Sequence, residues 1–280
     1  MIGLVVLAGL FGLLIGSFLN VVVWRVPRGE SLLPDSRCPK CDAAIRPWQN
    51  IPVISWLALR GKCANCKNPI SKRYPLVELA TGVIFALVTW WYASAFGDPF
   101  SVDGLVAVGW WAALAGYLWF AAASISLTLI DIELQRLPDA ITGTSFVVVA
   151  ALLGASAAIQ GFTAGEWSSL IGVFGGAAAV FGFYFLVAFV YPKGMGGGDV
   201  KLAPLVGAAL GYIGWSEVII GTFAGFLFGA LWGIALMLAK RAGRKTVIPF
   251  GPFMLLGAWA GLVAGSAVMG AYLSMSGLTS

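Results

Sequence analysis

The stretch IGLVVLAGLFGLLIGSFLNVVVW, Ile2–Trp24, runs for 23 residues without a single charged side chain. An apolar run of this length is long enough to cross the hydrocarbon core of a bilayer as one helix. No positively charged region precedes it, and no small-residue cleavage site of the kind found in secretory signal peptides follows it. We therefore expect a retained membrane-spanning helix here.

Further apolar runs follow, and they predict an all-α polytopic integral membrane protein with about eight transmembrane helices. The composition agrees, because a chain that is 60% hydrophobic and 10% charged, with a mean hydropathy of +0.92, lies far outside the range of soluble domains. One run, 202–215, is short, so it is expected to be tilted or buried in protein, and seven spans are the alternative. The runs after the first lie at about 76–96, 104–130, 140–160, 168–191, 202–215, 218–239 and 249–273.

The 17 Lys and Arg residues predict the orientation. Ten lie in the polar segment 25–75, and the other seven fall on the same side if eight helices cross the membrane. Basic loops stay in the cytoplasm, so both termini are expected on the outer side of the membrane. Seven spans would place the last basic cluster on the opposite side. The net charge of +5 thus reflects topology, and no nucleic-acid partner is expected. The seven basic residues outside the segment 25–75 are Arg136, Lys193, Lys201, Lys240, Arg241, Arg244 and Lys245.

Residues 25–75 form the only sizeable polar segment, and they are too few to bury a sufficient core without a staple. The segment contains a repeated pattern in RCPKCDAAI and KCANCKNPI, which gives the spacing Cys38-x2-Cys41-x21-Cys63-x2-Cys66. Two CxxC pairs in a cytoplasmic segment match tetrahedral thiolate coordination of zinc. Because four thiolates leave no coordination position open for water, we expect a structural Zn²⁺.

The four cysteines have three alternative roles. Disulfides are disfavoured in a reducing cytoplasm, and a thioredoxin-like redox pair lacks the surrounding βαβ pattern. An iron–sulfur cluster also needs four cysteines, and the spacing alone is compatible with one. The identity of the metal therefore stays open at this point.

Five of the twelve acidic residues lie near the expected cytoplasmic ends of helices. Asp131 ends the run SISLTLI, and Asp199 ends the glycine loop GMGGG. The eight-helix topology places both at the same depth, so their carboxyl groups are expected to meet. Two adjacent carboxyls share a proton, which is the chemistry of aspartic proteases. The chain has no His, which excludes Ser-His-Asp and Cys-His mechanisms and catalytic metals held by His.

The acids also have structural interpretations. Asp139, after Pro138, is expected to be the N-cap of the fourth span, and Glu133 is expected to be solvated in a loop. Glu78 either pairs with Lys72 or Arg73 or has a functional role. Helix capping is the alternative for Asp199, and Lys201 either tunes Asp199 or, in the interpretation we prefer, anchors its helix by snorkelling.

Glycines that recur every fourth residue along the last two runs are expected to serve helix packing. They are Gly221, Gly225, Gly229 and Gly233 in one run and Gly257, Gly261 and Gly265 in the other.

A series of motifs resembles the type IV prepilin peptidase family, which combines a leader peptidase with an N-methyltransferase. The GxGD motif of that family falls on Gly196-Gly197-Gly198-Asp199. The motifs cover nearly the whole chain in order: GSFLNVVVWRVPRG, the two CxxC pairs, RPWQNIPVISWLALRGKC, KRYPLVELATG, LIDIELQRLPD, GMGGGDVKL and IPFGPF.

The resemblance implies that Asp131 and Asp199 are the catalytic dyad of a membrane aspartic protease of the bacterial inner membrane, and it places Gly196, Gly198 and Lys201 in the substrate loop. It implies as substrates prepilins or type II secretion pseudopilins with a short basic leader. These are cut at the cytoplasmic membrane surface, and the new N-terminus is methylated with S-adenosylmethionine. The expected domains are a first transmembrane helix at 1–24, a zinc-binding, methyltransferase-associated insertion at 25–75 and a membrane-embedded peptidase domain at 76–280.

Other classes of protein remain as alternatives. In a transporter or channel, Asp131 and Asp199 would bind a cation or relay protons. In a non-enzymatic assembly subunit, the cysteine segment would be a docking module. A presenilin-like protease would share the GxGD chemistry, but it would not explain the cysteines. The sequence does not indicate an oligomeric state.

Overall fold

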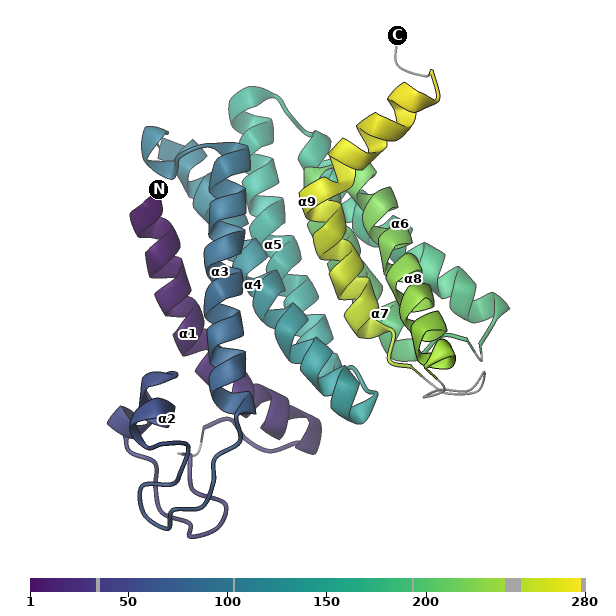
Figure 1. The fold of residues 1–280 in the computed structure, drawn as a ribbon. Helices are drawn as coiled ribbons and strands as arrows, with labels where there is room; N and C mark the ends of the chain where they lie inside the picture. The colour runs from purple at the N-terminus through teal and green to yellow at the C-terminus, as the bar shows by residue number, and fades with distance from the viewer. Residues whose placement is uncertain (34–35, 103, 193, 240–247, 278–280) are drawn as a thin grey trace. The chain divides into compact units, whose positions relative to one another are not determined.

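The computed structural model describes residues 1–33, 36–102, 104–192, 194–239 and 248–277 (Figure 1). Within these ranges the chain is helical, and its only β-type pairs are two isolated bridges. The chain forms two compact units, Met1–Asp98 and Pro99–Ser280. The expected all-α architecture is therefore confirmed. Of the basic residues used to predict the orientation, Lys193 and the cluster from Lys240 to Lys245 lie outside the described residues.

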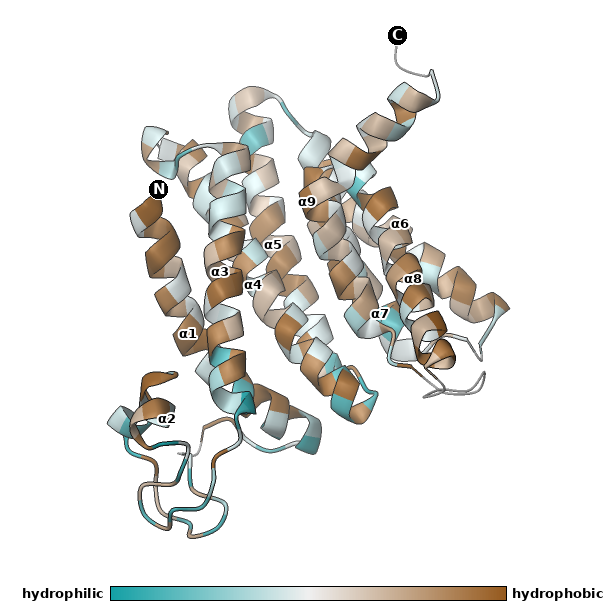
Figure 2. Ribbon diagram, in the orientation of Figure 1, coloured by the Kyte–Doolittle hydropathy of each residue, from teal (hydrophilic) through white to brown (hydrophobic). Residues whose placement is uncertain are grey.

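In the described part of the chain, seven helices are long and apolar enough to cross a membrane. Large apolar side chains stay exposed along them, for example Leu7, Phe174 and Leu231, and Figure 2 shows apolar colouring along much of their length. Such surfaces are stable where lipid replaces water, because a helix satisfies its own backbone hydrogen bonds. The seven candidate membrane-spanning helices are α1 (Ile2–Arg25), α3 (Arg73–Phe96), α4 (Gly104–Leu134), α5 (Asp139–Ala164), α6 (Ser168–Val190), α8 (Trp215–Leu238) and α9 (Gly251–Met275).

The eighth expected span is the helix α7 (Gly197–Ile213), which has 17 residues. A helix of that length spans about 25 Å, less than the ~30 Å of a hydrocarbon core. Most of its side chains are buried, and its neighbours include α5 and α6. The helix also begins earlier than the expected 202–215, so Asp199 lies in its first turn. Because α7 is surrounded by protein, its length does not have to match the bilayer.

In the unit Met1–Asp98, α1 and α3 pack with their backbones close together. A Cβ atom added to Gly16 would lie 2.7 Å from the Cα of Glu78, and one added to Gly12 would lie 2.8 Å from the carbonyl oxygen of Thr81. Small residues permit this approach. The cysteine-containing segment connects the two helices and includes the short helices η1 (Val26–Arg28), η2 (Pro47–Gln49) and α2 (Ile54–Ala58).

In the unit Pro99–Ser280, which begins with η3 (Pro99–Ser101), two helix pairs are joined through glycines. Gly172 and Gly176 of α6 contact the backbone of Gly207 and Gly211 of α7. The α8–α9 pair follows the glycine repeat in the sequence, since a Cβ atom on Gly261 would lie 2.6 Å from the Cα of Gly221. The packing role expected for the repeated glycines is confirmed at this contact.

Candidate active site and metal centre

Asp131 lies in the last turn of α4, and only 5% of its surface is exposed. Its Oδ2 accepts a hydrogen bond of 3.2 Å from the backbone nitrogen of Gly251, the first residue of α9. The first N–H groups of a helix have no partner inside the helix and form the positive end of its dipole. A carboxylate at this place is therefore held and stabilised. A Cβ atom on Gly251 would lie 2.8 Å from the same oxygen, so glycine makes the contact possible.

Asp199 is the third residue of α7, and 7% of its surface is exposed. Its Oδ2 accepts a hydrogen bond of 3.2 Å from the nitrogen of Gly196, and its own nitrogen donates to the carbonyl of Gly196 at 3.1 Å. These two bonds close the turn between the glycine loop and α7. The bond from Gly196 to the Asp199 carboxylate is thus of the kind that the capping interpretation predicted. This bond holds the Asp199 side chain in place.

The structure brings Asp131 and Asp199 close enough for their charges to interact. Leu137, between α4 and α5, packs beside both sites. A Cβ atom on Gly251 would lie 3.3 Å from Cδ1 of Leu137, and one on Gly198 would lie 3.2 Å from its Cβ. Two interacting buried carboxyls are not both ionised at low cost, which favours a state with one proton between them. A pair in that state can supply both an acid and a base.

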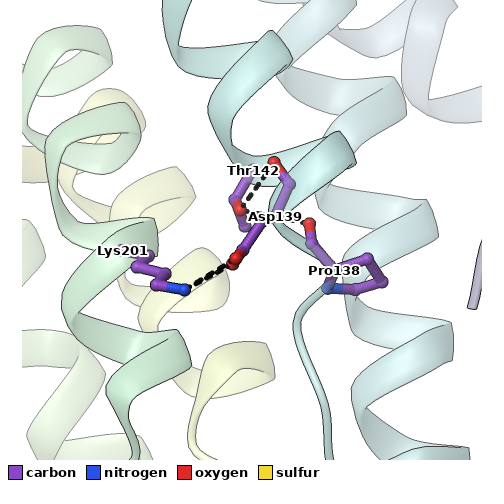
Figure 3. Close-up of polar contacts among 4 residues, drawn as sticks. All are labelled: Pro138, Asp139, Thr142 and Lys201. Carbon is purple, nitrogen blue, oxygen red and sulfur yellow. Dashed lines mark hydrogen bonds and ion pairs between the residues drawn. The ribbon is translucent and has the colours of Figure 1, made fainter.

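Lys201 forms an ion pair with Asp139 (Figure 3). Its Nζ lies 2.7 Å from each carboxylate oxygen of Asp139, and both side chains are mostly exposed. The expectation that Asp139 is a helix cap is wrong. Pro138, with extended backbone, is the N-cap of α5, and Asp139 follows it in the first turn. The bond from Lys201 therefore links the beginnings of α5 and α7. The exposed position of its ammonium group is compatible with the interpretation that Lys201 anchors its helix by snorkelling.

Two other acids, Glu133 and Glu78, have different surroundings. Glu133 is exposed, as expected, but it lies in the last turn of α4 and not in a loop. Glu78 is buried in α3, where its Oε2 accepts a hydrogen bond of 2.7 Å from the nitrogen of Val53. Among the described residues it forms no ion pair with Lys72 or Arg73.

Sequence reasoning did not identify Gly251 as part of the site. The signal was present in IPFGPF, where a glycine precedes a proline at the beginning of an apolar run, but the pattern does not reveal which side chain the glycine faces. It also missed an aromatic cluster near Asp199. The ring of Tyr184, which feels the charge of Asp199, lies 5.4 Å from the ring of Phe226, and Phe226 lies 5.1 Å from Phe250.

The four cysteines form a second cluster, in the unit Met1–Asp98. All four Sγ atoms lie within 4.8 Å of one another, and those of Cys38 and Cys66 are 3.8 Å apart. Four thiolates bound to zinc at about 2.3 Å in a tetrahedron have sulfurs separated by about 3.8 Å. None of the four forms a disulfide. The donor atoms therefore have the chemistry and the spacing that a tetrahedral metal ion requires.

The sequence repeat around the cysteines is also a structural repeat. In the first turn, the nitrogen of Cys38 donates to the carbonyl of Ala43 at 3.0 Å, and in the second, the nitrogen of Cys63 donates to that of Asn68 at 2.8 Å. The residue after each second cysteine has positive φ, at Asp42 and Lys67. Each turn folds its two sulfurs toward the other turn.

Backbone hydrogen bonds make three of the thiols more acidic. The N–H groups of Lys40 and Cys41 lower the pKa of Cys38, that of Ala43 lowers the pKa of Cys41, and that of Cys66 lowers the pKa of Cys63. A hydrogen bond from Asn68 acts the same way on Cys66, but burial and the other three thiols outweigh it and raise its pKa to about 11. Four thiols in contact resist full ionisation, and a bound cation removes that resistance.

Known proteins resemble this chain along almost its entire length. A prepilin leader peptidase/N-methyltransferase of Stutzerimonas stutzeri is 35% identical, over 98% of this chain and 95% of the relative. One of Pseudomonas aeruginosa is 34% identical, over 96% and 93%, and one of Neisseria gonorrhoeae is 37% identical, over 90% and 88%. The model of the bacterial peptidase A24 N-terminal domain matches residues 10–92, and that of the type IV leader peptidase family matches 118–234. No solved structure matches the chain.

The chain belongs to the type IV leader peptidase family. The resemblance inferred from the motifs is therefore confirmed. Each matched region contains one of the two groups of side chains described above. The four cysteines lie in the N-terminal match, and both aspartates lie in the peptidase match. The candidate membrane-spanning helices in the described part of the chain agree with a multi-pass membrane protein.

Proposed function

We propose that this protein removes the leader from prepilins or pseudopilins and then methylates the new N-terminal amine with S-adenosylmethionine. The observation that carries the proposal is the buried Asp131–Asp199 pair, in a chain that is similar over almost its whole length to prepilin leader peptidase/N-methyltransferases. An apolar substrate helix with a basic leader would lie in the bilayer with its scissile bond at the cytoplasmic boundary.

In the proposed cleavage, the ionised carboxylate of the pair takes a proton from water, and the water oxygen attacks the carbonyl carbon of the scissile peptide. The protonated carboxyl donates its proton to the carbonyl oxygen. The tetrahedral intermediate then collapses: the carboxyl that took up the water proton donates it to the leaving amine as the C–N bond breaks, and the other carboxylate takes a hydroxyl proton from the intermediate. These two transfers restore one acid and one base. The N–H groups of Gly251 and Gly196 would hold the two carboxyls in place. Gly196, Gly198 and Lys201 would border the substrate's extended segment.

The four cysteines would hold one structural Zn²⁺. With every coordination position occupied by sulfur, the ion would replace a hydrophobic core in the polar segment and take no part in hydrolysis. We assign the methyl transfer to the unit that contains this segment, in keeping with the proposed domain division at 1–24, 25–75 and 76–280.

The proposed location is the bacterial inner membrane with both termini in the periplasm. Alkaline phosphatase fused after the last helix should then be active, since this enzyme folds only outside the cytoplasm, and the same enzyme inserted after Leu134 should be inactive. The opposite pattern would contradict the orientation.

The function is tested with the full-length protein in liposomes and a purified prepilin, with and without S-adenosylmethionine. We expect loss of the leader in both cases and a further gain of one methyl group only with the donor, as measured by product mass. The same liposomes report on the transporter alternative, which requires acid-driven flux of protons or cations and no cleavage. Flux without cleavage would overturn the proposal.

A further inference from the structure

Glu78 is a buried carboxylate that the proposed cleavage does not use. It lies in α3 with 7% of its surface exposed, at the place where α1 and α3 approach most closely through Gly16. An ionisable group at this depth in a membrane helix is costly unless it is paired or has a function. The family resemblance assigns no role to it.

The partners of Glu78 are neutral donors. The nitrogen of Val53 donates to Oε2 at 2.7 Å, and the hydroxyl of Ser17 also donates to the carboxylate. A carboxylate has about four acceptor positions, and in the described part of the chain Glu78 forms no ion pair. A buried negative charge without a cation is unfavourable, and it is relieved either by a proton or by a cationic group. The carboxylate still has acceptor positions for such a group.

The backbone beside Glu78 is strained. Val53 has φ 61° and ψ −50°, values that a β-branched residue rarely adopts. A hydrogen bond of 2.6 Å from the nitrogen of Ile54 to the carbonyl of Pro52 closes a γ-turn around it. The hydrogen bond from the nitrogen of Val53 to Glu78 holds this turn. Strain of this kind is retained at ligand sites more often than elsewhere.

We propose that the Glu78 carboxylate receives the α-ammonium group of a methylation reactant. This inference rests on the proposed methyl transfer and gives it a binding residue. Two reactants carry an α-ammonium group: the amino-acid end of S-adenosylmethionine and the new N-terminus of the cleaved pilin. An ammonium group would supply the missing positive charge and form charge-assisted hydrogen bonds with the carboxylate, which are the stronger class.

The test uses full-length Glu78→Gln and Glu78→Ala, with Glu30→Gln as the matched control. Glu30 is an exposed carboxylate in the same unit, so its substitution changes the net charge equally. Glutamine at 78 retains an oxygen that can accept the Val53 N–H but lacks the charge, whereas alanine removes both. The readouts are binding of S-adenosylmethionine by calorimetry, the KM and kcat for methylation of a pre-cleaved pilin, and the zinc content as a measure of folding.

If Glu78 holds the donor, Glu78→Gln weakens S-adenosylmethionine binding about tenfold to 100-fold, the range expected for a hydrogen bond to a charged group. If it holds the pilin, donor binding is unchanged and the KM for the pilin rises by a similar factor. Zinc content stays at the wild-type level in both cases. The inference would be overturned if Glu78→Gln bound the donor and methylated the pilin like the wild type and only Glu78→Ala were impaired. Glu78 would then only support the Val53 turn. Failure of the wild type to methylate would instead refute the proposed function, and the inference with it.

Discussion

At the scale of single residues, the position of Asp131 depends on a glycine that is distant in sequence. Gly251 donates its N–H to Oδ2 of Asp131, and its backbone is so close to the carboxylate that a methyl group would touch it. Asp131 is therefore held by a main-chain atom of another helix as well as by its own helix.

Gly251→Ala should reduce leader cleavage about tenfold to 100-fold, because its Cβ would lie 2.8 Å from Oδ2 of Asp131 and would displace the carboxylate. Single-turnover cleavage rates measure the effect. Gly143→Ala in α5 is the matched control, since its Cβ would have no heavy atom within 4 Å. Wild-type rates for Gly251→Ala would show that this contact does not position Asp131.

The residue scale is also where the sequence is least informative. The CxxC spacing predicted the cysteine cluster, because four thiols at these intervals have few other uses. The sequence did not reveal that Gly251 faces Asp131 or that Lys201 pairs with Asp139, since both contacts join residues on different helices. It also misassigned the cap of α5, because Pro138 in an extended conformation ends the turn one residue before Asp139.

At the scale of elements, α7 carries Asp199, and the position of α7 is determined by its contact with α6. Gly172 and Gly211 place the two backbones in direct contact, with no room for a side chain between them. Hydrophobic runs predicted the helices themselves. They did not predict that α7 begins at Gly197. The sequence alone does not distinguish the glycines of the loop from the glycines that begin the helix.

Gly211→Ala should destabilise the protein by about 1–3 kcal/mol, because the added methyl group overlaps the carbonyl oxygen of Gly172 and the helices must separate. The change should lower the Tm in detergent and reduce cleavage, since Asp199 moves with α7. Gly182→Ala, on an open face of α6, should do neither. Equal Tm values for the two variants would contradict the close packing of α6 and α7.

At the scale of the whole molecule, two compact units contain two separate clusters of functional side chains. The aspartates belong to the unit Pro99–Ser280, and the cysteines and Glu78 belong to the unit Met1–Asp98. This division suggests that cleavage and methylation can be impaired independently.

Cys63→Ser should abolish stoichiometric zinc binding, expose the polar segment to proteases and impair methylation, while leader cleavage continues. The reason is that the metal contributes the folding free energy of a segment too small to have its own core. Elemental analysis and limited proteolysis measure the first two effects, with Ser31→Ala as the control.

In the wild type, zinc affinity should fall as the pH is lowered, because each thiolate must lose a proton before it binds the ion. The backbone hydrogen bonds that lower the pKa values of Cys38, Cys41 and Cys63 extend binding toward lower pH. Full zinc occupancy in Cys63→Ser would contradict the four-thiolate site.

In the proposed mechanism, Asp131 and Asp199 act together to cleave the leader. Single-turnover cleavage of a prepilin is therefore measured for the wild type, Asp131→Asn, Asp199→Asn and Glu133→Gln. We predict losses of at least about 100-fold for either Asn variant, because each removes one half of an acid–base pair. Glu133→Gln, an exposed change in the same helix turn as Asp131, should stay within about twofold. Normal cleavage by either Asn variant would contradict the dyad.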